Sequence, residues 1–177
     1  MERIDRIDRI SADVLRKKLN FCGLPHPRFS VVIPIVMDPD GTKLLIEVRA
    51  PGISQAGDPC FPGGKIEEAE TPHAAAVREL GEELGIVVSE SELLGRIPTV
   101  DTYLGSMTDI FVCMLSPEKA DAMSPNIGEV SEVLRVPISY FAERAGDMSF
   151  QFAGHTIWGM TAGAIRHLCE IIGDDPR

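Results

Sequence analysis

Residues 64–86 place several acidic side chains and one arginine at fixed intervals in a segment that reads as a helix. At about 100° per residue, Glu79, Glu82 and Glu83 fall within roughly 100° of one another on one side. Like charges at these spacings repel, whereas clustered carboxylate oxygens are the ligands that Mg²⁺ and Mn²⁺ prefer, often together with substrate phosphates. The spacing therefore indicates a metal site for phosphate chemistry, and the alternative is a solvated acidic helix face.

The same segment carries its own helix start and stop signals. Thr71 is suited to cap the first turn, Pro72 to occupy the first helical position, and Gly85 to end the helix in the left-handed conformation. A second side of this helix is apolar and is expected to pack on a sheet; it comprises Val77, Leu80 and Leu84.

Written as a pattern, the segment reads G-x5-E-x7-R-E-U-x-E-E-x-G-U, in which U is an aliphatic residue. The constrained positions are filled by Gly64, Glu70, Arg78, Glu79, Leu80, Glu82, Glu83, Gly85 and Ile86. This is the Nudix box, and the chain resembles the Nudix hydrolase superfamily. The resemblance implies attack of water on one phosphorus of a diphosphate linkage, assisted by Mg²⁺ or Mn²⁺.

The resemblance also implies roles for individual residues. The metal ligands would be Glu79, Glu82, Glu83 and the backbone carbonyl of Gly64, and Arg78 would orient a box glutamate. Glu70 would be structural. A further carboxylate, acting as general base, is expected from a later loop: Glu129 is the first candidate and Glu132 the second. The alternative for Glu129 is a solvent-facing acid at a strand end.

Segments outside the box resemble the coenzyme A diphosphatase subfamily. They are LLIEVRA (44–50), CFPGG (60–64) and HTIWGMTAGAIRHL (155–168), and the resemblance covers about residues 30–172. It implies cleavage of coenzyme A or its thioesters to phosphopantetheine and adenosine 3′,5′-bisphosphate. The loop 51–59 lacks the basic residues usual in that subfamily. Other nucleoside diphosphate derivatives (ADP-ribose, NADH, nucleoside triphosphates) and a non-catalytic nucleotide-sensing module are the alternatives.

Two residues near the box are candidates for substrate binding. Arg49 would clamp a phosphate or would be a surface charge, and Phe61 would contact substrate or only shape the loop that leads into the box. Trp158, the one tryptophan, stands at a predicted helix start and reads first as a packing residue.

Composition bounds the remaining expectations. A chain of 177 residues with 44% hydrophobic and 25% charged residues fits one globular domain over 1–177, with a helical extension over 1–24. The net charge of −10 argues against nucleic acid or an anionic membrane as partner. A small-molecule nucleotide diphosphate is the expected partner. Apolar positions on the N-terminal helix would suit a homodimer or equally would pack on the chain's own sheet.

The cysteines and histidines form no recognisable ligand or disulfide pattern. The start of the chain resembles no export signal, and the longest apolar run is too short to span a bilayer. A reducing cytoplasmic location is therefore expected. The four cysteines are widely spaced and include no C-x-x-C pair; they are Cys22, Cys60, Cys113 and Cys169.

Periodicity predicts interleaved helices and strands. Helices are expected at 6–19, in the box, and at 137–145 and 157–172, and strands at 29–37, 43–49, 92–101, 107–115, 129–136 and 148–152. Because a hairpin precedes the box helix, the sheet should be mixed. The expected fold class is thus α/β in the broad sense (α+β), with a mixed sheet between helices, and the resemblance sharpens it to a Nudix-type α/β/α sandwich.

Overall fold

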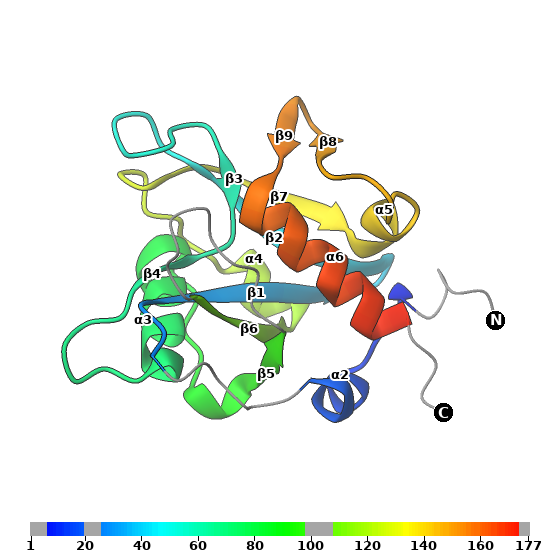
Figure 1. Cartoon of the computed structure of the whole chain (residues 1–177), viewed down its shortest axis with the longest axis horizontal. Coiled ribbons are helices and arrows are strands. Elements are labelled where there is room, and N and C mark those ends of the chain that lie inside the picture. The colour runs from blue at the N-terminus through cyan, green and yellow to red at the C-terminus, as the bar shows by residue number, and fades with distance from the viewer. Residues whose placement is uncertain (1–6, 20–25, 98–107, 174–177) are drawn as a thin grey trace.

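The computed structural model describes residues 7–19, 26–97 and 108–173. A seven-stranded mixed sheet lies between helices that cover its two faces (Figure 1). Its strands are β1 Phe29–Asp38, β2 Gly41–Arg49, β3 Pro59–Cys60, β4 Gly63–Lys65, β5 Leu93–Ile97, β6 Thr108–Leu115 and β7 Val130–Pro137. The helices are α2 Ala12–Lys18, α3 Pro72–Leu84, α4 Pro117–Asp121, α5 Ile138–Ala142 and α6 Gly159–Gly173, with a 3₁₀ turn at Glu90–Glu92 and a small hairpin of β8 Phe150–Phe152 and β9 His155–Ile157.

The strand β1 forms the centre of the sheet and is buried on both faces. It pairs antiparallel with β2 and β4 and parallel with β6. Because successive side chains point to opposite faces, Ile33 and Ile35 enter one core, whereas Val32 and Val36 enter the other. The first core is closed by α2, α5 and α6 and the second by α3 and α4. The prediction of a mixed sheet between helices is confirmed.

The box helix α3 begins and ends where its sequence signals predict. The Thr71 Oγ1 atom accepts a hydrogen bond from the Ala74 N–H at 3.0 Å, and Pro72 occupies the first turn. Gly85 ends the helix with φ of +68°, and a Cβ at this position would lie 2.7 Å from the Ser124 carbonyl oxygen. A glycine is thus required twice over, for its conformation and for the close approach of the 122–129 segment.

Several segments differ from the sequence prediction. The N-terminal helix is shorter than 6–19, because Ser11 caps α2 and the Asp8 carbonyl accepts hydrogen bonds from Thr42. The expected loop 50–63 contains β3, and the expected loop 116–128 contains α4, which Ser116 caps. The strand expected at 92–101 is observed to Ile97, and its last residues lie outside the described part of the chain.

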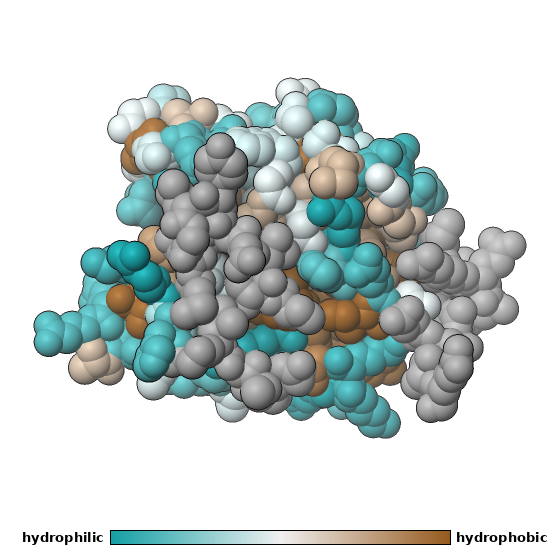
Figure 2. Space-filling model, in the orientation of Figure 1, coloured by the Kyte–Doolittle hydropathy of each residue, from teal (hydrophilic) through white to brown (hydrophobic). Residues whose placement is uncertain are grey.

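The coloured part of the surface seen in Figure 2 is mainly polar. Hydrophilic residues predominate among the coloured residues there, with smaller hydrophobic areas between them. Trp158, predicted as a packing residue, is instead 50% exposed at the start of α6. No helix among the described residues is long and apolar enough to cross a membrane.

Candidate functional site

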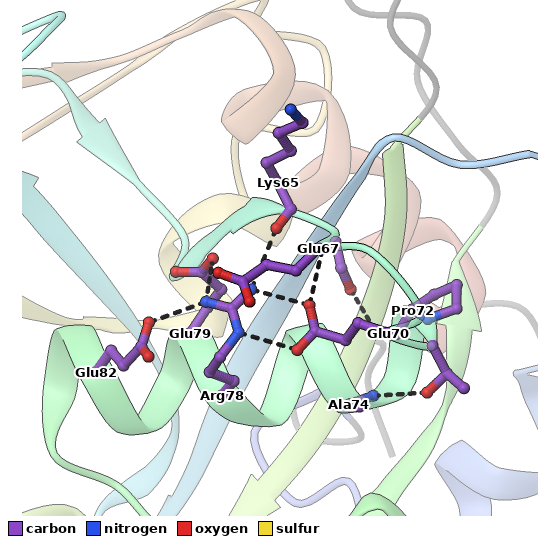
Figure 3. Close-up of polar contacts among 10 residues, drawn as sticks. Lys65, Glu67, Glu70, Pro72, Ala74, Arg78, Glu79 and Glu82 are labelled. Atoms are coloured by element: carbon purple, nitrogen blue, oxygen red, sulfur yellow. Dashed lines mark hydrogen bonds and ion pairs between the residues drawn. The ribbon is translucent and has the colours of Figure 1, made fainter.

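Arg78 connects the acidic residues on the outer side of α3 (Figure 3). Its Nε and Nη2 atoms donate to the two carboxylate oxygens of Glu70 at 2.9 and 3.0 Å. Its Nη1 atom donates to Glu79 at 2.8 Å and to Glu82 at 2.9 Å, and Nη2 donates also to the Lys65 carbonyl oxygen at 3.1 Å. These five contacts use the full donor capacity of a guanidinium group.

This arrangement fixes the strand–loop–helix segment as one unit. Glu70 accepts from Arg78 and from the Glu67 N–H at 3.0 Å, so it ties the loop before α3 to the helix. The hydrogen bond from Arg78 lowers the pKa of Glu70 below its usual value. Arg78 holds β4 through the Lys65 carbonyl and holds the carboxylate of Glu79 in place. Glu82 is more than half exposed.

Glu83 points the other way, toward the sheet. Its carboxylate accepts a hydrogen bond from the Gly63 N–H at 2.8 Å, and the residue is only 7% exposed. Burial raises the pKa of Glu83 to about 8, and the charge of Glu47 adds to this effect. Burial also raises the pKa of Glu79, against the opposing effect of Arg78.

The two glycines of β4 admit these carboxylates. A Cβ on Gly64 would lie 2.7 Å from Cδ of Glu79, so a side chain there would occupy the space of the carboxylate. A Cβ on Gly63 would lie 2.7 Å from Cα of Val31 on the neighbouring strand. Glycine at both positions therefore lets α3, β4 and β1 pack closely around the two acids.

The structure adds one carboxylate that the sequence analysis missed. Glu47, in β2, is 1% exposed and lies on the α3 side of the sheet, two residues after the buried Leu45. Its Oε1 atom accepts from the Cys60 thiol at 3.3 Å, and its Oε2 atom has no hydrogen-bond partner among the described residues. Burial raises its pKa to about 7, and the charges of Glu129 and Glu79 act in the same direction.

Glu129 approaches this group from the segment after α4. The Asn126 N–H donates to the Glu83 carbonyl at 2.8 Å, and the Ala50 N–H donates to the Glu129 carbonyl at 2.8 Å. The segment is therefore joined both to the end of α3 and to the end of β2. The charge of Glu129 contributes to the raised pKa values of Glu47, Glu79 and Glu83, which puts its carboxylate within electrostatic range of all three.

The other candidate residues lie in different surroundings. Glu132 is half exposed and contacts His155 Nε2 at 3.1 Å. The Arg49 Nε atom donates to the Ser54 carbonyl at 2.7 Å, so the guanidinium braces the 50–58 loop, with Nη1 3.9 Å from the Cys60 sulfur. Phe61 is buried in the core formed with α6. This position favours the alternative in which Phe61 shapes the loop that leads into the box, and its contact with substrate stays a prediction.

The donor set suits a hard divalent cation. Glu79, Glu82 and Glu83 would supply carboxylate oxygens, and Gly64 would supply its backbone carbonyl. In the described ranges no three His, Cys, Asp or Glu side chains converge closely enough to hold an ion. Arg78 engages Glu79 and Glu82, and the Gly63 N–H engages Glu83. The donor types match those that Mg²⁺ and Mn²⁺ prefer, and binding would require these contacts to be exchanged.

Comparison with known proteins gives one family. Residues 26–149 match the family model described as the NUDIX domain. The chain is 33% identical, over 92% of each protein, to an Escherichia coli protein described as the uncharacterized Nudix hydrolase NudL.

Two solved structures share the fold. The NUDIX domain of Shewanella oneidensis NrtR complexed with ADP ribose has a TM-score of 0.60 at 17% identity, covering 83% of this chain and 89% of that one. A Caenorhabditis elegans Ap4A hydrolase in a binary complex has a TM-score of 0.58 at 12% identity, covering 82% of this chain and 98% of that one. At these identities the likeness concerns the fold alone.

Proposed function

The chain belongs to the Nudix hydrolase family, whose members generally need divalent metal ions, and it is a diphosphohydrolase acting on a nucleoside diphosphate derivative. From this premise we propose that its substrate is coenzyme A or a coenzyme A thioester and that its ion is Mg²⁺ or Mn²⁺. The products would be the phosphopantetheine portion and adenosine 3′,5′-bisphosphate.

One observation carries the choice of substrate. The three segments that resemble coenzyme A diphosphatases are distant in sequence but adjacent in the fold. Cys60 in β3 pairs with Glu47 in β2, and the Thr161 hydroxyl in α6 donates to the Pro59 carbonyl at 3.3 Å. The first two segments thus lie beside the acidic group, and the third contacts β3 from α6, which packs on the opposite face of the sheet. The meeting of the three segments at β3 is where a nucleotide substrate would be recognised.

The box residues supply the proposed chemistry. A divalent ion held by Glu79, Glu82, Glu83 and the Gly64 carbonyl would neutralise charge that develops on the phosphate oxygens and lower the pKa of a water molecule. Arg78 keeps the box glutamates oriented and remains charged, since its hydrogen bonds with Glu70, Glu79 and Glu82 raise its pKa. Glu129, which is exposed, would accept the proton of the attacking water.

Other substrates of the same bond type form the second candidate. The 51–59 loop contains no arginine, lysine or histidine that would grip the 3′-phosphate of coenzyme A. ADP-ribose or NADH lacks that group and would place less demand on the loop. A non-catalytic sensing role is less well supported, because every carboxylate of the box is present.

The test is mass spectrometry of products from a panel of coenzyme A, acetyl-coenzyme A, ADP-ribose, NADH, diadenosine polyphosphates and 8-oxo-dGTP, each with Mg²⁺ or Mn²⁺. Release of phosphopantetheine and adenosine 3′,5′-bisphosphate is the expected result. Preferential cleavage of another compound would overturn the coenzyme A proposal and retain the hydrolase. A Glu83→Gln preparation, purified in parallel, controls for contaminating hydrolases. Binding without turnover of any compound would indicate a sensor.

A further inference from the structure

The side chain of Glu47 is placed where the family motif assigns no ligand. We propose that Glu47 is a further member of the metal-binding site and supplies a carboxylate oxygen from β2, opposite the glutamates of α3. This inference rests on the proposed function, because it concerns the ion which that function requires. The proposed ligands would then come from β2 as well as from α3 and β4.

The burial of Glu47 is the first observation. The residue is 1% exposed, and its Oε2 atom is without a hydrogen-bond partner in the part of the chain that the structure describes. Burial of a carboxylate oxygen without a hydrogen-bond partner is energetically unfavourable, more so than burial of a neutral polar group. The one donor to Oε1 is the Cys60 thiol, a weak donor whose own pKa is raised by burial.

The lack of a partner calls for an explanation. Oε2 has no hydrogen-bond partner among the described residues, so a purely structural role leaves one buried polar atom of the carboxylate unsatisfied. An ion bound beside Glu47 would satisfy that oxygen and would account for its position.

The surroundings of Glu47 are the second observation. The acids whose charges raise its pKa are Glu129 and Glu79, and Glu47 in turn is the largest charge acting on Glu83. These carboxylates come from three separate elements: β2, α3 and the segment before β7. Against them, among the residues that the structure describes, the charge of Arg49 lowers the pKa of Glu47, and the Arg49 Nε atom is used by the Ser54 carbonyl. The group therefore gathers more carboxyl groups than its neighbouring cation could balance if they were all ionised.

Glu83 and Glu47 both lie between α3 and the sheet. Glu83 reaches toward the sheet and bonds to Gly63, whereas Glu47 lies on the sheet face that α3 covers. The pairing of Glu47 with Cys60 places it beside the strand that continues into Gly63 and Gly64. An ion held between α3 and β4 is thus adjacent to β2 as well.

The experiment is isothermal titration of Mn²⁺ into the full chain at one fixed pH. Glu47→Gln keeps the shape and the acceptor for the Cys60 thiol but removes the charge. We expect its Mn²⁺ affinity to fall by about 10-fold or more, and that of Glu83→Gln to fall at least as far. Glu118→Gln, an exposed substitution on α4, is the matched control and should bind as the wild type does.

A second measurement separates a metal role from a structural one. The melting temperature of metal-free Glu47→Gln should equal or exceed that of the wild type, since a buried charge among like charges is removed. A lower melting temperature with unchanged Mn²⁺ affinity would overturn the inference and leave Glu47 as a packing residue. Glu47→Asp retains a carboxylate and should bind Mn²⁺ more tightly than Glu47→Gln, which tests the inference even if the glutamine variant does not fold.

The outcomes also distinguish this inference from the proposed function. Unchanged affinity in Glu47→Gln together with lost affinity in Glu83→Gln would refute only the role of Glu47. Unchanged affinity in both variants would refute the metal site on which the proposed hydrolysis depends.

Discussion

The two sides of α3 place identical acidic side chains in opposite surroundings. On the outer side, Glu70 and Glu82 bond to Arg78, and the pKa of Glu70 is lowered. On the sheet side, Glu83 and the facing Glu47 are buried, no arginine in the described ranges donates a hydrogen bond to either, and their pKa values are raised to about 8 and about 7. The first group holds the segment together, whereas the second resists ionisation without a cation, and a bound cation would favour its charged form.

The strongest test of this comparison is Glu83→Gln. If the sheet-side acids hold the ion, the variant should lose turnover by about 10²-fold or more while its fold is retained. Steady-state hydrolysis with Mg²⁺ or Mn²⁺ measures the loss, and circular dichroism checks the fold. A variant with near-normal kcat would remove Glu83 from the set of metal ligands.

A smaller effect is expected for Glu129→Gln, the solvent-exposed acid near the buried group. Loss of a general base should lower kcat by about 10²-fold with little change in the affinity for Mn²⁺. The rate as a function of substrate concentration, together with Mn²⁺ titration, separates the two effects. Glu132→Gln, which removes only the contact with His155, is the matched comparison. Unchanged kcat in Glu129→Gln would exclude the residue as the base.

The pH dependence of stability should also separate the two groups. Glu47 and Glu83 have pKa values above the ordinary 4.5, so the metal-free native state binds more protons than the unfolded state between about pH 5 and 8. The free energy of unfolding should therefore fall by about 1–3 kcal/mol as the pH rises through that window. Glu70 has the opposite effect on the free energy of unfolding. Because its pKa is lowered by Arg78, the stability that it contributes is present above pH 4.5 and is lost as the pH falls below that value.

Urea unfolding in the presence of EDTA at several pH values measures this slope. Addition of Mn²⁺ should reduce the loss of stability at pH 8, because the ion binds the deprotonated acids. Stability that rises between pH 5 and 8 without metal would contradict the surroundings described for Glu47 and Glu83.

The smallest expected effect concerns the outer group. Arg78→Lys retains the charge but cannot form the two parallel bonds to Glu70 and the bonds to Glu79 and Lys65 together. Because the side chain is about a quarter exposed, a loss of about 1–2 kcal/mol in the free energy of unfolding is expected. Urea denaturation measures it, and no change in stability would argue against a structural role for Arg78.

Local signals in the sequence predicted the parts of the site that lie on one helix. The spacing of Glu79, Glu82 and Glu83 gives their directions around α3, and Thr71 and Gly85 give its ends, since these depend on contacts three to four residues apart. The mixed sheet followed from the hairpin of β1 and β2. The interruption of the N-terminal helix before α2 could not be predicted in this way, because it depends on hydrogen bonds from Thr42, which lies far along the chain.

Contacts between distant segments explain what was missed. Glu47 in a strand reads as a solvent-facing residue, and only the packing of α3 over β2 reveals that it is buried. The burial of Phe61 and the exposure of Trp158 likewise depend on how α6 meets the sheet. Spacing along the sequence carries no information on such distances.

The 50–58 loop is closed at its base by two backbone hydrogen bonds of Arg49. The Arg49 N–H donates to the Asp58 carbonyl at 3.1 Å, and the Gly57 N–H donates to the Arg49 carbonyl at 2.9 Å. Because both ends are fixed at one residue, the loop can be lengthened or replaced at a modest entropic cost, about 0.6 kcal/mol for each doubling of its length. If this loop recognises the substrate, exchanging this single connection between β2 and β3 should change the substrate range and leave the strands that flank it in place.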